Sequence, residues 1–307
     1  MIEVRDLTKK YGSHTAVDRL SFTIEKGSIY GLLGPNGAGK STTMNIIAGC
    51  LAATSGSVKI DGHDVFDEPL EAKRLVGYLP EIPPLYVEMT PSEYLAFVAE
   101  AKGVPYEKRI REMKDVMEAT GILEVKDRLI RNLSKGYRQR VGIAQAMIGD
   151  PEVIILDEPT VGLDPKQIIE IRELIRMLGE KKTVVISSHI LAEISAVCDR
   201  VIIIAGGRKV ADDSLEELER RAVRGNGLTV VARTGRARVE KILSGVTGCD
   251  ILEISEEGGK TTALAGSGGQ PEDAFTETVF RAFASAGVPL LSLFRKESSL
   301  ESVFLEL

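Results

Sequence analysis

The strongest constraint on this chain is the segment GPNGAGKST at positions 34–42. It matches the pattern G-x-x-x-x-G-K-[ST], follows the apolar run SIYGLL and opens a helical pattern, STTMNIIAG. In that setting backbone N–H groups can surround phosphate oxygens at the positive end of a helix, which argues against a glycine-rich turn that matches by chance. The residues expected around the phosphates are Gly34, Pro35, Asn36, Gly37, Ala38, Gly39, Lys40, Ser41 and Thr42.

Three further side chains complete a candidate site. We expect Lys40 to reach the β- and γ-phosphates and Ser41 to bind Mg²⁺. Asp157 and Glu158 follow the apolar run VIIL, and a surface turn explains one such carboxylate better than a pair. We assign Asp157 to Mg²⁺ and Glu158 to polarising the attacking water as general base. His189 follows another buried strand pattern, TVVISS, which favours the same site over a structural role. These residues define a P-loop NTPase and leave a nucleotide kinase or a helicase open.

The chain of 307 residues suggests about two domains. In residues 1–211 the early strands have little helix between them, which predicts an antiparallel β lobe, and the later apolar strands alternate with helices, which predicts a parallel sheet. The expected class is α/β, a P-loop NTPase with a mixed or parallel sheet and a helical subdomain at about 82–149. The pattern is helical between about 90 and 149 and begins at a capping box, Thr90-Pro-Ser-Glu93, and Asp164-Pro165 opens another helix in the same way. Expected strands are 2–6, 17–24, 28–33, 57–60, 75–79, 153–157, 183–187 and 200–205.

Residues 212–307 form a second, accessory or regulatory domain in this interpretation. The element order is strand, helix, strand, strand, helix, strand, which is the order of a ferredoxin-like domain. A short amphipathic helix, SLESVFLEL, is expected at the end. No chemistry is evident in this part of the sequence, and a role in dimer contacts or regulation is the default. The expected elements are 228–234, 236–244, 249–255, 260–265, 272–286 and 289–295.

Composition limits the classes of partner and the cellular location expected for this chain. A net charge of −6 argues against a nucleic-acid binder that relies on a global positive field. Cys50, Cys198 and Cys249 are widely spaced without a CxxC pair, as expected of reduced thiols. No run approaches the ~18 apolar residues of a membrane helix, and the N-terminus lacks the apolar core of a signal peptide. We expect a soluble, cytoplasmic protein that meets a membrane only through a partner.

A segment about a hundred residues after the phosphate-binding loop identifies the family. The motifs GPNGAGKST, LSKGYRQR, VIILDEPTVGLD and SSH occur in this order, and together they resemble the ATP-binding cassette of ABC proteins over residues 1–211. The resemblance implies a head-to-tail homodimer with two ATP molecules sandwiched between the copies. Ser134 and Gly136 of the signature then serve the loop of the other copy. Ser134 can cap the helix and offer its hydroxyl outward, and Gly136 lets the backbone approach.

Other positions take roles from the same resemblance. Tyr11 matches the aromatic residue that stacks on adenine, although an ordinary tyrosine at the end of a strand is the alternative. The loop 162–164 matches the segment that touches the opposite subunit, and His189 matches the residue that contacts the γ-phosphate. The implied ligands are ATP and Mg²⁺.

The sequence departs from the family pattern at three positions. Lys135 and Tyr137 stand where the signature LSGGQ has glycine and glutamine, and we expect function to survive because Ser134 and Gly136 are kept. Glu81 stands where the family usually has glutamine. It is still an oxygen ligand for Mg²⁺, but it adds negative charge near the triphosphate.

A finer resemblance points to transport. The text VGYLPE..PLYVEMTPSEYLAF and the terminal SLESVFLEL are similar to bacterial ABC ATPases that serve a separate exporter-type permease, including the gliding-motility and multidrug export subgroup. This implies a peripheral ATPase on the inner face of the cell membrane, and no nucleic-acid partner. Leu85 and Tyr86 are candidate permease contacts, with internal packing as the alternative.

Two other functions are weaker. A soluble ABC ATPase acting on the ribosome or DNA ranks behind, because the chain has one cassette, no sustained heptads and an acidic balance. A catalytically inactive interaction module is opposed by the presence of Lys40, Asp157 and Glu158.

Overall fold

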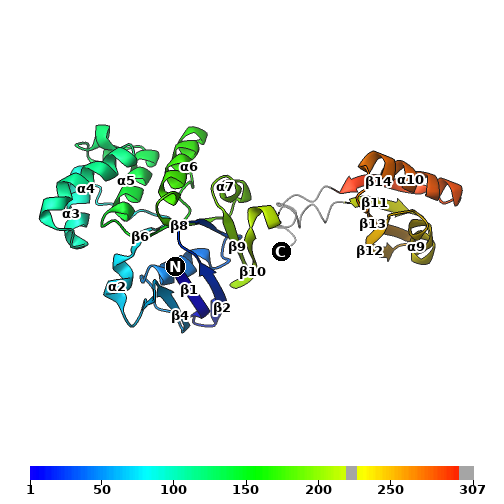
Figure 1. The fold of residues 1–307 in the computed structure, drawn as a ribbon, viewed down its shortest axis with the longest axis horizontal. Coiled ribbons are helices and arrows are strands. Elements are labelled where there is room, and N and C mark those ends of the chain that lie inside the picture. Colours follow the sequence, from blue (N-terminus) through cyan, green and yellow to red (C-terminus); the bar gives the residue numbers. More distant parts are fainter. Residues whose placement is uncertain (219–226, 297–307) are drawn as a thin grey trace. The chain divides into compact units, whose positions relative to one another are not determined.

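The structure, a computed structural model, describes residues 1–218 and 227–296. Contacts divide the chain into two compact units, Met1–Leu215 and Glu216–Leu307 (Figure 1). The domain boundary expected after residue 211 falls inside a strand, β10 (Arg208–Ser214), so the division comes where this strand ends. The terminal helix expected from SLESVFLEL lies outside the described residues.

The first unit contains an antiparallel sheet with the strand order β2-β1-β4-β5. The long hairpin of β1 and β2 alternates buried and exposed positions, as expected for a sheet with one face on the core, and its register shifts several times. Because these irregularities interrupt the apolar alternation, the sequence predicted only parts of both strands. The strands are β1 (Ile2–Tyr11), β2 (His14–Ile24), β4 (Ser55–Ile60) and β5 (His63–Asp64).

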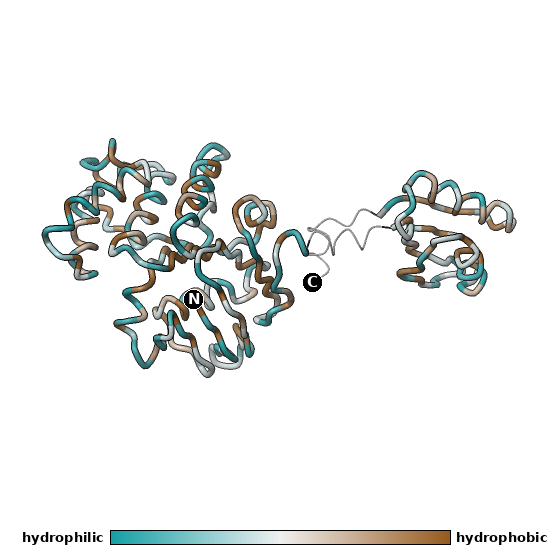
Figure 2. The backbone as a smooth tube through the Cα atoms, viewed as in Figure 1, coloured by the Kyte–Doolittle hydropathy of each residue, from teal (hydrophilic) through white to brown (hydrophobic). Residues whose placement is uncertain are grey.

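The second sheet of this unit is the predicted parallel sheet with one antiparallel edge, in the order β10-β9-β3-β8-β7-β6. Strands β3, β7 and β8 are buried at every position, which explains their continuous apolar sequences, and hydrophobic residues follow β8 and β9 in Figure 2. The strands besides β10 are β3 (Ile29–Leu33), β6 (Val76–Leu79), β7 (Val153–Leu156), β8 (Thr183–Ser188) and β9 (Arg200–Ala205).

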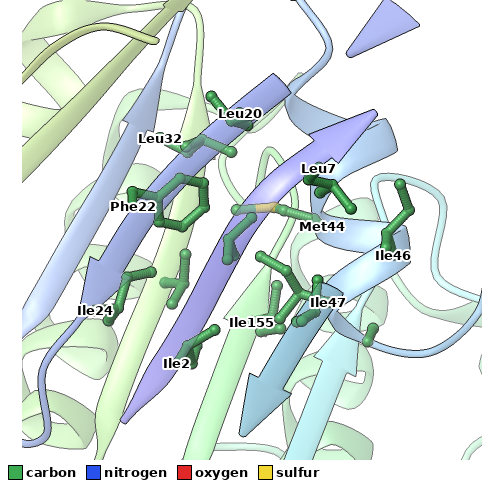
Figure 3. Close-up of a cluster of buried hydrophobic side chains, with 14 of the residues drawn as sticks. Ile2, Leu7, Leu20, Phe22, Ile24, Leu32, Met44, Ile46, Ile47 and Ile155 are labelled. Atoms are coloured by element: carbon green, nitrogen blue, oxygen red, sulfur yellow. The ribbon is translucent and has the colours of Figure 1, made fainter. Parts of the chain in front are cut away.

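The core between the two sheets holds the phosphate-loop helix α1 (Lys40–Ile47) in place. Met44 and Ile47 of this helix pack with Ile2 and Phe22 of the antiparallel sheet and with Ile155 of β7 (Figure 3). Burying each such side chain stabilises the fold by roughly 1.5–3 kcal/mol. The nucleotide loop therefore joins a strand and a helix that are both anchored in one core.

The helical subdomain has its own core and lies at one end of the unit (Figure 1). Its first helix begins at the predicted capping box, where Thr90 and Glu93 bond to each other's backbone N–H groups. The continuous helical pattern expected at 90–149 is broken by two 3₁₀ turns, η1 (Leu123–Val125) and η2 (Ile130–Asn132). The helices are α3 (Pro91–Ala101), α4 (Tyr106–Ala119) and α5 (Lys135–Met147), and α2 (Pro69–Arg74) precedes them. Two helices of the first unit follow β7 and β8, α6 (Pro165–Gly179) and α7 (Leu191–Ser195).

The second unit has the predicted β-α-β-β-α-β order of a ferredoxin-like domain. Its sheet is antiparallel throughout, in the order β12-β13-β11-β14, and Phe275 and Phe283 of α10 contribute to a core of its own. The fold class expected from the sequence is confirmed. The elements are β11 (Gly227–Ala232), α9 (Arg236–Ser244), β12 (Asp250–Glu257), β13 (Lys260–Gly266), α10 (Glu272–Ser285) and β14 (Leu290–Lys296).

Candidate nucleotide site

The phosphate loop takes its shape from three glycines. Gly39 caps α1 with φ at 102°, a region that side chains other than glycine rarely adopt. A Cβ at Gly34 would collide with the carbonyl oxygen of Ile204, so the loop passes against β9 without a side chain. Gly37 has φ at 79° and open space where a Cβ would stand. The backbone is therefore bare on the side where phosphate oxygens would approach.

Lys40 places a buried positive charge inside this loop. Its side chain is 6% exposed, and Nζ donates to Gly34 O at 2.8 Å and to Pro35 O at 3.3 Å. The same nitrogen lies 3.5 Å from Glu158 Oε1. A cation held this way at the start of a helix suits an anionic ligand.

The carboxylate of Asp157 joins the loop to the sheet. Its Oδ1 accepts hydrogen bonds from Ser41 Oγ at 3.1 Å and from Ser187 Oγ at 2.6 Å. Burial raises the pKa of Asp157, the two hydroxyls oppose that effect, and the charges of Glu158 and Glu81 add to it. The site thus concentrates negative charge next to the hydroxyl of Ser41.

Glu158 is held in an unusual backbone conformation, with φ at 48°. Its N–H donates to Ser187 Oγ at 2.8 Å, so one hydroxyl holds both the carboxylate of Asp157 and the backbone of Glu158. The ring nitrogen Nδ1 of His189 lies 3.1 Å from Glu158 Oε2 and 3.2 Å from Oε1. Because an ionised carboxylate only accepts hydrogen bonds, Nδ1 carries the proton in this contact.

Most of the predicted residues line one cavity of about 580 Å³. Tyr11 is 49% exposed at the end of β1, with Lys9 Nζ 5.2 Å from its ring centroid, and Glu81 is also part of the lining. Asp157 does not line the cavity; it is 1% exposed and lies behind Ser41, whose hydroxyl donates to it. The lining residues are Tyr11, His14, Ala16, Asn36, Gly37, Ala38, Gly39, Lys40, Ser41, Thr42, Glu81, Glu158, Val161 and His189.

The signature residues stand apart from this cavity. Among the described residues, neither Ser134 nor Gly136 is part of its lining. Ser134 caps α5, with its hydroxyl accepting from Tyr137 N at 3.3 Å, and is exposed. A Cβ at Gly136 would lie 2.6 Å from the side-chain Cδ of Gln167 on α6, so glycine permits this helix contact.

Both departures in the signature have defined neighbours. The phenol of Tyr137 donates to Glu124 of η1, which ties the signature to the rest of the helical subdomain. Lys135 reaches the loop after Glu158: its Nζ lies so close to Gly162 that a Cβ there would collide with it. Gly162 has φ at 69°, a backbone conformation that favours glycine.

The other end of the signature helix is also capped. Nζ of Lys102, which follows α3, donates to the carbonyl oxygens of Gln145, Ala146 and Ile148 at 3.1, 3.3 and 2.7 Å. The first two carbonyls belong to the last turn of α5 and the third to Ile148, which caps it, so the cation opposes the negative end of the helix dipole. Helix α5 is therefore fixed at both ends by side-chain contacts.

Sequence reasoning missed the residues that hold the site together. Ser187 and Thr160 fell within the motifs SSH and VIILDEPTVGLD but were given no role of their own, and Glu193 was not singled out. The adjacent hydroxyls SS before His189 were the available signal. His14 and Ala16, which line the cavity, carried no signal in the sequence.

The residues present fit a Mg²⁺ nucleotide. Open backbone at Gly37 and the cation of Lys40 suit phosphate, and the Ser41 hydroxyl beside the Asp157 carboxylate is the oxygen donor pair that Mg²⁺ takes together with phosphate and water. No group of three or more His, Cys, Asp or Glu residues that could hold a metal ion occurs within 1–218 and 227–296. In the same described part of the chain, no helix is long and apolar enough to cross a membrane.

Comparisons with known proteins agree with this geometry. The ABC transporter family matches residues 17–161. Bacitracin transport ATP-binding protein BcrA of Bacillus licheniformis is 40% identical over 223 residues, 72% of each chain. Nod factor export ATP-binding protein I of Ralstonia nicotianae is 35% identical over 219 residues, 71% of this chain and 68% of that protein.

Two solved structures are similar in fold. The ATP-binding subunit of an ABC transporter aligns with a TM-score of 0.66 and 32% identity, covering 72% of this chain and 92% of that chain. The cassette MJ0796, solved as a dimer in a post-hydrolysis state with ADP and Pi, aligns with a TM-score of 0.64 and 27% identity, covering 70% and 99%.

Fold and site together define a P-loop ATPase of the cassette class. The chain belongs to the ATP-binding proteins of ABC transporters, and it binds and hydrolyses ATP.

Proposed function

We propose that this chain is the ATP-hydrolysing subunit of an ABC exporter, closes as a head-to-tail homodimer on ATP, and drives a separate membrane permease. The observation that carries the dimer is the division of the phosphate site. Lys40 and Ser41 line the cavity, whereas Ser134 and Gly136 at the positive end of α5 are not among its described lining residues. In this proposal a second copy brings those residues to the nucleotide. The MJ0796 cassette, which is similar over 70% of this chain, was solved as a dimer.

The chemistry assigned to the site follows from the contacts. Lys40 binds the phosphates, and Ser41 and Asp157 hold Mg²⁺, with Glu81 as an additional oxygen ligand. When bound, Mg²⁺ offsets phosphate charge. Glu158 takes the proton of the attacking water as general base. The contact to His189 fixes the carboxylate, and the imidazolium form of this ring donates from Nδ1 to Glu158 and from Nε2 to a γ-phosphate oxygen. Tyr11 stacks on adenine.

The surface after Glu81 is the proposed permease contact. Tyr86 is 51% exposed and packs edge-on against Tyr94 and obliquely against Phe97, with centroids 5.9 and 5.3 Å apart. Ile82 is 83% exposed nearby in the sequence. Leu85, the other candidate contact, packs against the core of the helical subdomain and is removed from the proposed surface. An aromatic cluster beside exposed apolar residues suits a cytoplasmic loop of a membrane protein.

The direction of transport, export, is proposed from the names of the relatives. Nod factor export protein I is named for export, and BcrA for bacitracin transport. In this proposal the chain is peripheral on the inner face of the cell membrane, held there by the permease.

A pull-down from mild-detergent extracts of native cells, with a tagged chain and mass spectrometry, tests the proposal. We expect one polytopic membrane protein to be recovered with the wild type and to be lost with Ile82→Glu or Phe97→Glu. Ile110→Glu is the matched control, since Ile110 is 77% exposed on α4 outside the aromatic cluster. Recovery of ribosomal or DNA-repair proteins without a permease would contradict the proposal.

A further inference from the structure

One carboxylate outside the described nucleotide cavity links two parts of the catalytic site. Oε2 of Glu193, on α7, accepts hydrogen bonds from Thr160 Oγ1 at 2.7 Å and from Ser188 Oγ at 2.9 Å. Thr160 is 4% exposed and Ser188 2% exposed, so both hydroxyls are buried with this partner. Hydrogen bonds to a charged acceptor are among the stronger ones in proteins.

The contact to Ser188 fixes the backbone around His189. The Ser188 hydroxyl donates to Glu193 and accepts from Ile190 N at 3.0 Å. The residue before the histidine thus binds the residue after it, and Glu193 holds that turn. The position of the His189 ring depends on this backbone, because Nδ1 must stay within reach of Glu158.

The contact to Thr160 fixes the loop that leaves Glu158. Val161 N donates to Glu158 O at 3.3 Å and Leu163 N donates to Thr160 O at 3.2 Å, so residues 158–163 form consecutive turns. The far end of these turns is Gly162, which lies against Lys135 of the signature. Thr160 therefore stands between the carboxylate of Glu158 and the segment next to the signature helix.

We propose that Glu193 is a positioning residue for ATP hydrolysis, which couples the loop 158–163 to the turn that carries His189. This inference rests on the proposed roles of Glu158 and His189. It assigns a regulatory consequence to the same site: displacement of Gly162 by the other copy is transmitted through Thr160 and Glu193 to the histidine. Ser187, by contrast, orients Asp157 and Glu158 alone.

The link predicts a specific kinetic pattern. Removing the Glu193 carboxylate leaves two buried hydroxyls without their acceptor, and the turn at His189 loses its hold. Lys40 and the glycine loop, which hold most of the nucleotide's phosphate contacts in the proposal, are untouched. We therefore expect the loss to fall on kcat and not on the KM for ATP.

The experiment compares Glu193→Ala, Glu193→Gln, Thr160→Val and the double variant in steady-state phosphate release, with rates divided by the sites that bind a fluorescent ATP analogue. Glu193→Ala and Thr160→Val are each expected to lower kcat about tenfold, with KM within about twofold. The double variant is expected to be no slower than Glu193→Ala, because both changes break one link. Glu193→Gln keeps an acceptor oxygen and should retain most of the rate. Glu173→Ala, at an exposed position of α6, is the control.

An unchanged kcat in Glu193→Ala, or fully additive losses in the double variant, would overturn the proposal. If Glu193→Ala fails to fold, the remaining variants decide: a wild-type rate in Thr160→Val contradicts the link, and so does a loss in Glu193→Gln as large as that in Thr160→Val. The proposed catalytic role is tested separately, since Glu158→Gln hydrolysing ATP at the wild-type rate would remove it whatever Glu193 does.

Discussion

His189 Nδ1 lies 3.1 Å from Glu158 Oε2, although the two residues follow different strands of the sheet. The pair forms because β7 and β8 are parallel neighbours whose carboxyl ends meet at one edge. Glu158 is 7% exposed and His189 37% exposed, so the histidine bridges the buried carboxylate and the open part of the cavity.

We predict that His189→Ala lowers kcat for ATP hydrolysis roughly a hundredfold, because positioned groups of this kind contribute about 10²–10⁴-fold. ATP binding should be nearly unchanged, since Lys40 and the glycine loop are intact. Steady-state phosphate release and equilibrium nucleotide binding measure the two quantities. His63→Ala, at a half-buried position outside the cavity, is the control, and a loss of less than about threefold in His189→Ala would contradict the assignment.

Asp157→Asn should abolish hydrolysis and yet raise the melting temperature of the nucleotide-free chain. Burial raises the pKa of Asp157, so keeping it ionised in the fold costs stability relative to the unfolded chain. Linkage gives the direction of the pH dependence. Above the ordinary pKa of 3.8 the folded chain holds the Asp157 proton more tightly than the unfolded chain, so the free energy of unfolding falls as the pH rises towards the raised pKa of the folded state. Because asparagine does not ionise, the variant does not lose stability in this way as the pH rises.

Thermal melting at pH 4 to 8 checks this expectation. The difference between variant and wild type should be largest at neutral pH and should shrink towards pH 4. Asp67→Asn, at an exposed position after β5, is the control. A lower melting temperature for Asp157→Asn at every pH would show that the carboxylate stabilises the empty site.

Gly162→Ala should destabilise the cassette mainly through backbone strain, because the Lys135 Nζ that the new Cβ would meet is the end of a flexible side chain and can move away. Strain at positive φ costs about 1 kcal/mol, and Gly103→Ala, with φ at 73° and no neighbour within 4 Å, measures that strain alone. Thermal melting should therefore show similar losses for the two variants. A loss in Gly162→Ala several times larger than in Gly103→Ala would contradict this expectation.

Lys102→Met should loosen the signature helix at its C-terminal end. Three carbonyl oxygens at the C-terminal end of α5 lose their cation, which we expect to cost about 1 kcal/mol at this exposed position. Hydrogen exchange of the amides in the last turn of α5 should accelerate, and Lys108→Met, at an exposed position of α4, should leave it unchanged. Unchanged exchange in Lys102→Met would mean that the contact adds nothing.

The sequence was sufficient for those parts of the site whose geometry is local. The phosphate loop, the capping box at Thr90, and the caps at Ser134 and Asp164 were predicted because each depends on a few consecutive residues. The β-α-β-β-α-β order was readable for a similar reason, since strand alternation and helix periodicity repeat within each element.

The missed features depend on which strands become neighbours. Ser187 orients Asp157 only because β8 pairs with β7, and Glu193 reaches Thr160 across the same pair. Strand β10 escaped prediction because RKVADDS is polar and partly exposed at the edge of the sheet. Leu85 and Tyr86 are adjacent in the sequence, and only the packed structure shows that the Tyr86 ring is exposed while Leu85 packs against the core.

The most direct test of the account is the mass of the Glu158→Gln variant with Mg·ATP, measured by light scattering during gel filtration. Without hydrolysis, ATP should hold two copies together and roughly double the particle mass. Adding Ser134→Asp places negative charge against the partner's phosphates, and this double variant should bind ATP as a monomer. A Glu158→Gln protein that binds Mg·ATP and stays monomeric would contradict the shared site. So would a double variant with Ser134→Asp that still dimerises on ATP.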